Sequence, residues 1–215
     1  MSLHYSASRF LLGGLVGALS GWEVRGREHI PLTGGLIVAS NHISFWDPPL
    51  VCTAVVRELH FLAKEELFRP PVLGSLIRSF NAIPIRRGMA DLSGLTKAMD
   101  VLRAGRALIM FPEGARGRDG ELHAARPGVG MLAVATDARV VPAYISGSNH
   151  PAKWLFRLGQ VRVWFGSSRT WRELAGPDTE LEPGRALYQS VSAGVMREIA
   201  ALRAGQLKSA ARGAA

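Results

Sequence analysis

The stretch GGLIVASNHISFWDP, residues 34–48, decides the fold class. Its first part, GGLIVAS (34–40), is an unbroken apolar run, which is typical of a strand buried on both faces. The part that follows places His42 and Asp47 directly after that strand, and Pro48 where a helix would begin. In α/β proteins the carboxyl end of a strand faces an open crevice. The junction therefore predicts a strand-to-helix unit and a functional site in one place.

Apolar runs alternate with segments of helical periodicity along most of the chain. The predicted strands are GGLIVAS, HFLA (60–63), AIPI (82–85), ALIMF (107–111), VVPAYI (140–145) and the half-exposed QVRVWFG (160–166). The predicted helices cover residues 48–59, 71–80, 91–105, 126–138 and 187–205. This order predicts an α/β fold, with a largely parallel central sheet flanked by helices.

The length of 215 residues and the 47% share of apolar residues suit one large domain with a substantial core. We find no internal repeat and no long linker. The sequence predicts a domain over residues 25–205 and, because apolar periodicity ends there, a flexible tail over 206–215.

Residues 1–24 form a separate N-terminal segment that contains the apolar stretch FLLGGLVGALSGW (10–22). This stretch is shorter than the roughly 20 residues of a membrane-spanning helix, so we expect a helix that lies in the membrane interface. Two alternatives remain: a cleaved signal peptide, since Ala18, Leu19 and Ser20 resemble a small-residue cleavage site, and an ordinary packing helix.

The 26 Lys and Arg residues against 17 Asp and Glu give a net charge of +9, which indicates an anionic partner. Nucleic acid, an acidic membrane surface and a phosphorylated small molecule all fit that charge. The arginines gather at strand ends rather than on a recognition helix, which speaks against nucleic acid. Cys52 is the only cysteine, so an intramolecular disulfide and a cysteine metal cluster are excluded.

His42 and Asp47 have the chemistry of a general-base pair. An imidazole can take a proton from an alcohol, and a carboxylate on its other nitrogen selects the tautomer and balances the charge. The alternative is structural: Asp47 caps the helix that starts at Pro48, and His42 is a hydrogen-bonded turn residue.

Two further strand ends carry arginines. MFPEGARGRDG (110–120) displays Glu113, Arg116 and Arg118 on a loop, and NAIPIRRGMA (81–90) places Arg86 and Arg87 after a strand. If the strands are parallel, these five charged side chains lie on the same rim of the sheet as His42. Guanidinium groups bind phosphate through paired hydrogen bonds, although a solvated basic loop explains either segment alone.

The four segments together resemble the sequence boxes of the glycerolipid acyltransferases. NHISFWD is similar to their NHxxxxD box, AIPIRRG to the second box, FPEGARG to the third and VVPAYISG to the fourth. The boxes occur in the order and spacing of that family, over residues 25–150.

The resemblance implies acyl transfer from a thioester to a hydroxyl of 1-acylglycerol-3-phosphate, without a covalent acyl-enzyme. The donor would be acyl-coenzyme A or acyl carrier protein, a co-substrate, and no cofactor or metal is implied. His42 would act as general base and Asp47 would orient it. The expected acceptor-binding residues are Arg87 and Arg116 at the phosphate, Glu113 and Gly114 around the glycerol, and Lys64 as added charge.

The chain departs from the family pattern in the third box, which usually reads EGTRS. Ala115 and Gly117 here lack the two hydroxyls, which puts the identity of the acceptor in doubt. In the second box Asn81 replaces a common glycine, and asparagine tolerates left-handed backbone angles. The alternatives are another lysophospholipid or amphiphilic alcohol as acceptor, or a non-catalytic module that binds anionic membranes.

Because the acyl chain is insoluble, the resemblance implies a peripheral or monotopic enzyme at the cytoplasmic side of a membrane. The partners would then be the lysophospholipid, the thioester donor and the membrane surface. Phe45 and Trp46 either line a passage for the acyl chain or pack in the core.

Overall fold

The computed structural model describes residues 3–19, 21–85, 92–117, 119–150, 153, 160–177 and 182–213. Within these ranges, seven strands form one sheet in the order β1-β7-β6-β2-β5-β3-β4. The strands are β1 (Glu23–Arg25), β2 (Leu36–Ser40), β3 (Leu59–Lys64), β4 (Ala82–Ile85), β5 (Ala107–Met110), β6 (Arg139–Ser146) and β7 (Arg162–Phe165).

Five neighbouring strands, from β6 to β4, run parallel. β7 is antiparallel to β6, and β1 runs parallel to β7, so these two strands oppose the other five. The predicted α/β class with a largely parallel sheet is confirmed, as is each strand that the sequence predicts. The short β1 is not predicted, because three residues carry too little periodicity.

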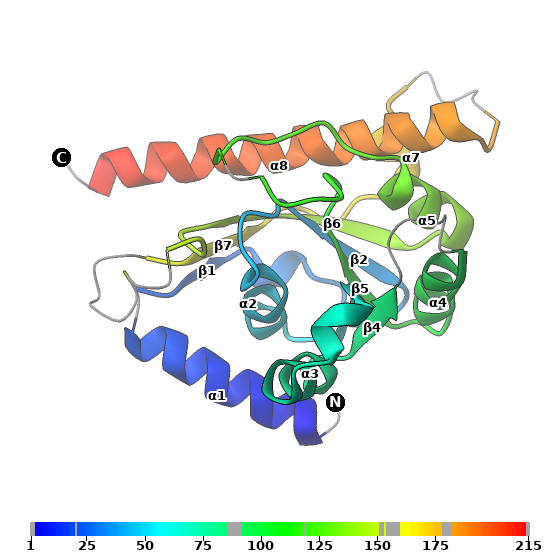
Figure 1. Ribbon diagram of the computed structural model, residues 1–215. Helices are drawn as coiled ribbons and strands as arrows, with labels where there is room; N and C mark the ends of the chain where they lie inside the picture. The colour runs from blue at the N-terminus through cyan, green and yellow to red at the C-terminus, as the bar shows by residue number, and fades with distance from the viewer. Residues whose placement is uncertain are drawn as a thin grey trace.

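Helices cover both faces of the sheet (Figure 1). On one face lie α1 (Leu3–Leu19), α2 (Asp47–Ala54) and α3 (Pro71–Ser79), with the 3₁₀ turn η2 (Glu65–Phe68) before α3. On the other face lie α4 (Leu92–Arg103), α5 (Gly128–Thr136), α7 (Trp171–Ala175) and α8 (Arg185–Gly213). A second 3₁₀ turn, η1 (Arg27–His29), follows β1.

The apolar run 34–40, which contains β2, is unbroken because helices cover both faces of the sheet. Leu36 and Val38 of β2 face the core beneath α1 and α2, whereas Ile37 and Ala39 face the core beneath α5 and α8. Successive side chains of a strand point to opposite faces, so a strand covered twice needs apolar residues throughout. β2 is the fourth of the seven strands that the structure describes, between β6 and β5, which places its carboxyl end centrally.

α1 packs against the core on one side and exposes large apolar side chains on the other. Tyr5 is fully buried and its hydroxyl accepts a hydrogen bond from the backbone N–H of Leu59. The hydroxyl of Ser8 in α1 donates a hydrogen bond to the hydroxyl of Ser79 in α3, so the two helices lie side by side. These contacts show that one face of α1 packs against the rest of the domain. The same helix exposes four large apolar side chains: Leu3, Phe10, Leu11 and Leu15.

α8 is longer than the predicted helix over 187–205, and residues 206–213 are helical where the sequence predicts a flexible tail. Gln206 explains the difference. Its side chain is buried, accepts a hydrogen bond from Ser146 and donates one to the carbonyl of Tyr144. These contacts with β6 hold the helix on the sheet beyond the point where its apolar pattern stops.

Asn81 has a φ of 56°, so the expected left-handed turn is confirmed at that position. Among the helices that the structure describes, none combines the length and the apolar character that crossing a membrane requires.

Candidate active site

Asn41 ties the end of β2 to the neighbouring strand β6. Its buried side chain donates from Nδ2 to the carbonyl of Ile145 at 3.0 Å. Its Oδ1 accepts from the backbone N–H of Ile145 at 2.8 Å. The carboxamide thus satisfies two buried backbone groups at the point where the chain leaves the sheet, and it holds the start of the turn in place.

Asp47 is folded back into this turn. Its Oδ2 accepts hydrogen bonds from the backbone N–H groups of Ile43 and Ser44, each at 2.7 Å. A capping residue would instead accept from N–H groups inside the helix that follows. The capping alternative for Asp47 is therefore wrong: α2 begins at Asp47, with Pro48 in its first turn, and the carboxylate points backward.

The same oxygen of Asp47 lies 2.8 Å from Nδ1 of His42. The His42 side chain is 16% exposed and that of Asp47 is 0% exposed. The ring of Phe111 stacks on the imidazole at 4.0 Å between centroids and 21° between planes. Because Asp47 engages Nδ1, Nε2 is the ring nitrogen through which His42 can take a proton from a substrate.

Ser148 contacts the second oxygen of the carboxylate. Its hydroxyl donates to Oδ1 of Asp47 at 2.5 Å, and both side chains are fully buried. The two residues lie 101 positions apart in the chain. The carboxylate is thus bound at both oxygens and shielded from water.

Glu113, on the loop that follows β5, reaches the same turn. Its Oε1 accepts a hydrogen bond from the backbone N–H of His42 at 3.4 Å. Its Oε2 is buried without a hydrogen-bond partner among the described residues. Burial raises the pKa of this carboxyl above its usual value, and the backbone hydrogen bonds from His42 and His123 counteract part of that effect.

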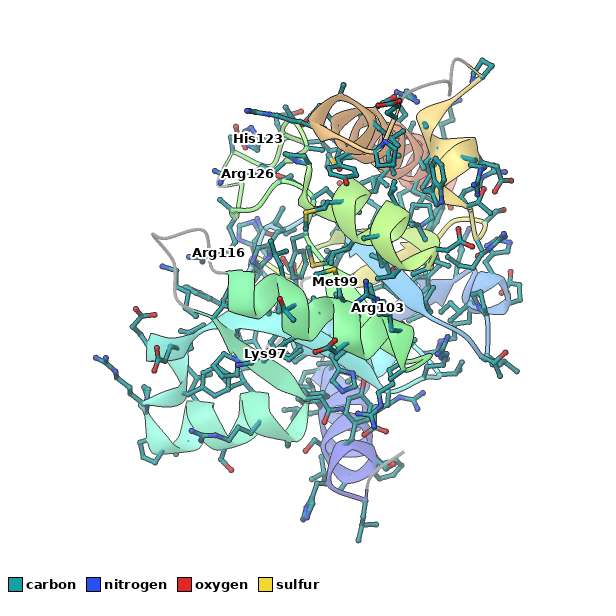
Figure 2. The ribbon with its side chains drawn as sticks, turned by 90° about the vertical axis from the view of Figure 1, so that its right-hand side faces the viewer. Lys97, Met99, Arg103, Arg116, His123 and Arg126 are labelled. Carbon is teal, nitrogen blue, oxygen red and sulfur yellow. The ribbon has the colours of Figure 1, made fainter. Side chains whose placement is uncertain are left out.

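The rest of this loop is shaped by close contacts. Gly114 has a φ of 70°, and a Cβ there would lie 2.6 Å from Cδ of Arg126, so the position requires glycine. The backbone N–H of Gly117 donates to the carbonyl of His42 at 2.8 Å. The guanidinium carbon of Arg116 lies 3.4 Å from the ring centroid of Phe45. Figure 2 shows Arg116 and Arg126 along one edge of the molecule.

The structure therefore brings together His42, Asp47, Glu113, Gly114 and Arg116 from two segments of the chain. Lys64 lies at the carboxyl end of β3, with β5 between that strand and β2. It therefore shares the edge of the sheet with His42 but stands farther out. Arg87 lies outside the described residues.

Arg86 and Arg118 also lie outside the described residues. Two residues of the site were not predicted from the sequence: Ser148 and Phe111. Phe111 ends the predicted strand 107–111 and Ser148 follows the predicted strand 140–145. The rule that parallel strands end at one edge is the signal that points to both.

A protein-family model described as Acyltransferase matches residues 21–146, which is more than half of the chain. The matched range includes His42, Asp47 and the whole loop after β5.

Several curated proteins named 1-acyl-sn-glycerol-3-phosphate acyltransferase are similar to this chain. One from Bacillus subtilis is 26% identical over 147 residues, which are 68% of this chain and 72% of that protein. One from Limnanthes douglasii is 32% identical over 162 residues, or 71% of this chain and 56% of that protein. One from Borreliella burgdorferi is 30% identical over 129 residues, which are 59% of this chain and 52% of that protein. The chain thus spans about half the length of several of these relatives.

A solved structure has the same fold. The crystal structure of the 1-acyl-sn-glycerophosphate (LPA) acyltransferase PlsC from Thermotoga maritima superposes with a TM-score of 0.67 and 30% sequence identity. The superposition covers 95% of this chain and 84% of that chain. The matched sequence model, the relatives and the fold agree, and the chain belongs to the acyltransferase family.

Proposed function

We propose that this protein transfers a fatty acyl group from a thioester donor to the hydroxyl of 1-acylglycerol-3-phosphate, giving phosphatidic acid. One observation carries the proposal: Nδ1 of His42 lies 2.8 Å from a fully buried carboxylate, that of Asp47, at the carboxyl end of a central strand. The names of the relatives in three organisms support the choice of acceptor.

His42 is the general base in this proposal. Its Nε2 takes the proton of the acceptor hydroxyl while the oxygen attacks the thioester carbonyl, and Asp47 stabilises the imidazolium that forms. A carbon–oxygen bond forms and the carbon–sulfur bond breaks. The thiolate then leaves with the proton that His42 returns. A thioester is already activated, so the reaction needs no acyl-enzyme.

Glu113, Arg116 and Arg87 hold the acceptor in the same proposal. Glu113 has a buried oxygen, Oε2, that can accept a hydrogen bond from a glycerol hydroxyl. Arg116, on the rim of the site, supplies charge for the phosphate. Lys64, at the same edge of the sheet, adds to that charge. Ala115 and Gly117 have no hydroxyl, so these charged groups must recognise the acceptor without that help.

We further propose that the protein acts as a peripheral enzyme on a membrane surface. Leu3, Phe10 and Leu11 of α1 are 83%, 80% and 70% exposed, and Val72 of the neighbouring α3 is 84% exposed. Exposed apolar side chains on two neighbouring helices, in a chain of net charge +9, suit an anionic lipid surface.

The test is transfer of labelled acyl groups to 1-acylglycerol-3-phosphate in vesicles, with acyl-coenzyme A and acyl carrier protein as separate donors. We expect His42→Ala and Asp47→Asn to lower kcat by about 10²- to 10⁴-fold. His60→Ala is the matched control, because His60 lies near the amino end of β3, at the opposite edge of the sheet. Full activity of a folded His42→Ala protein would overturn the mechanism.

A panel of acceptors decides the substrate. Glycerol 3-phosphate, neutral monoacylglycerol and other lysophospholipids are compared with 1-acylglycerol-3-phosphate at equal surface concentration. Preference for a different acceptor, with the same loss in His42→Ala, would keep the general base and replace the proposed acceptor. Binding to vesicles without transfer to any acceptor would favour the non-catalytic module.

A further inference from the structure

Ser148 occupies a fixed position against the catalytic turn. Between the end of β6 and Ser148 stands Gly147, which has a φ of 78°. A side chain has no room there, because its Cβ would meet the carbonyl oxygen of Gln160. The turn therefore holds Ser148 where its fully buried hydroxyl meets Asp47.

The two oxygens of Asp47 have different partners. Oδ2 accepts from Nδ1 of His42 and from the backbone of Ile43 and Ser44, all within its own turn. Oδ1 accepts from Ser148, at 2.5 Å. A hydrogen bond of this length to an ionised oxygen is charge-assisted and strong.

The torsion that turns a carboxylate about its Cβ–Cγ bond is soft and broadly populated. Three donors at Oδ2 hold one end of the group, and the bond from Ser148 to Oδ1 stops its rotation. A fully buried carboxylate also needs hydrogen-bond donors at both oxygens, because an unpaired buried polar group is costly.

We infer that Ser148 is a positioning residue for the acyl transfer: its hydroxyl keeps the Asp47 carboxylate in the plane that holds His42 with Nε2 toward the substrate. The inference rests on the proposed function. Ser148 differs from two other serines, Ser192 and Ser146, whose hydroxyls make hydrogen bonds to neutral groups. Ser192 is equally buried and accepts from the backbone N–H of Gly130, and Ser146 donates to Gln206.

The kinetic test compares Ser148→Ala, Ser148→Thr and Ser192→Ala in the acyl-transfer assay. We expect Ser148→Ala to lower kcat by about 10- to 100-fold, since the bond is made to a charged group. KM for donor and acceptor should not change, because Ser148 reaches the substrates only through Asp47 and His42. Ser148→Thr, which keeps the hydroxyl, should restore kcat, and Ser192→Ala should leave it unchanged.

A double mutant separates positioning from packing. If Ser148 acts through the carboxylate, Ser148→Ala added to Asp47→Asn should cause no further loss of kcat. Losses that multiply, or an unchanged kcat in Ser148→Ala, would overturn the inference. Should Ser148→Ala fail to fold, Ser148→Cys takes its place, because a thiol keeps the volume but is a weak donor.

A spectroscopic test does not depend on turnover. In protein labelled with ¹⁵N-histidine, the Nδ1–H proton of His42 reports its bond to Asp47. We expect that signal to shift in Ser148→Ala and to stay in place in Ser192→Ala. An unchanged signal overturns the inference even if transfer is found. A shifted signal in a protein that transfers no acyl group would keep Ser148 coupled to the pair and reject only the proposed function.

Discussion

The guanidinium of Arg116 lies over the ring of Phe45, with 3.4 Å between its central carbon and the ring centroid. Arg116 belongs to the loop after β5, and Phe45 to the turn after β2 that carries His42. Phe45 is 64% exposed, so the pair sits on the rim of the site and the stack holds the arginine beside the turn that carries His42.

Phe45→Leu should weaken binding of the phosphorylated acceptor. A cation–π contact at an exposed site contributes about 0.5–1 kcal/mol, so we expect KM for the acceptor to rise roughly 2- to 5-fold with kcat unchanged. Steady-state kinetics with the acceptor varied measure this. Trp171→Leu removes a similar stack under Arg172, on α7, and serves as the control. Equal KM values in both variants would show that the stack does not position Arg116.

Glu113→Gln should stabilise the protein increasingly as pH rises. Burial raises the pKa of Glu113, so the folded carboxyl loses its proton at a higher pH than the unfolded one, whose ordinary value is 4.5. Ionisation in the window above 4.5 therefore removes stability from the folded state, and glutamine avoids that cost. Tm measured against pH for both proteins should diverge through this window.

Glu121→Gln is the matched comparison on the same loop and should behave in the opposite way. Arg203 donates to both carboxylate oxygens of Glu121, at 2.7 and 2.9 Å, and lowers its pKa. The ionised form is thus favoured in the folded state, and its stabilisation disappears as pH falls through the lowered pKa. The two substitutions should give Tm differences of opposite sign near neutral pH. Parallel curves would contradict the assignment for Glu113.

Tyr5→Phe should loosen α1. The change leaves the buried N–H of Leu59 without its acceptor, which costs about 1–3 kcal/mol. Cys52 reports the effect, because its thiol is fully buried beside the Tyr5 hydroxyl and burial raises its pKa to about 12. We expect a thiol reagent to label Cys52 roughly 5- to 150-fold faster in Tyr5→Phe. Phe10→Ser, on the exposed face, should leave the labelling rate unchanged.

Phe10→Ser and Leu11→Ser should lower binding to anionic vesicles. Both side chains lie on the exposed face of α1, and burying a large apolar side chain contributes about 1.5–3 kcal/mol. Sedimentation with vesicles should show the loss in each variant. Leu32→Ser is the control, since Leu32 is 74% exposed but lies outside α1 and α3. If Leu32→Ser reduces binding as much, α1 is not the docking surface.

Most of the fold was predictable because its signals are local. An apolar run bounded by turn residues predicted β2, and helical periodicity predicted α3, α4, α5 and most of α8. The parts that sequence reasoning missed lack such a signal. β1 has three residues and α7 has five, and the end of α8 is held by Gln206 rather than by an apolar stripe.

By itself, the sequence determined the alternation of strands and helices and placed His42, Asp47 and Glu113 at strand ends, because periodicity and spacing are properties of short segments. The tertiary structure alone decided which groups surround the carboxylate of Asp47. Ser148 lies 101 residues from Asp47, and Phe111 comes from another strand end, so the chain segments meet only after the sheet has formed. The pairing of β2 with β5 and β6 brings these side chains to one edge, and no local pattern encodes which donor meets which oxygen there.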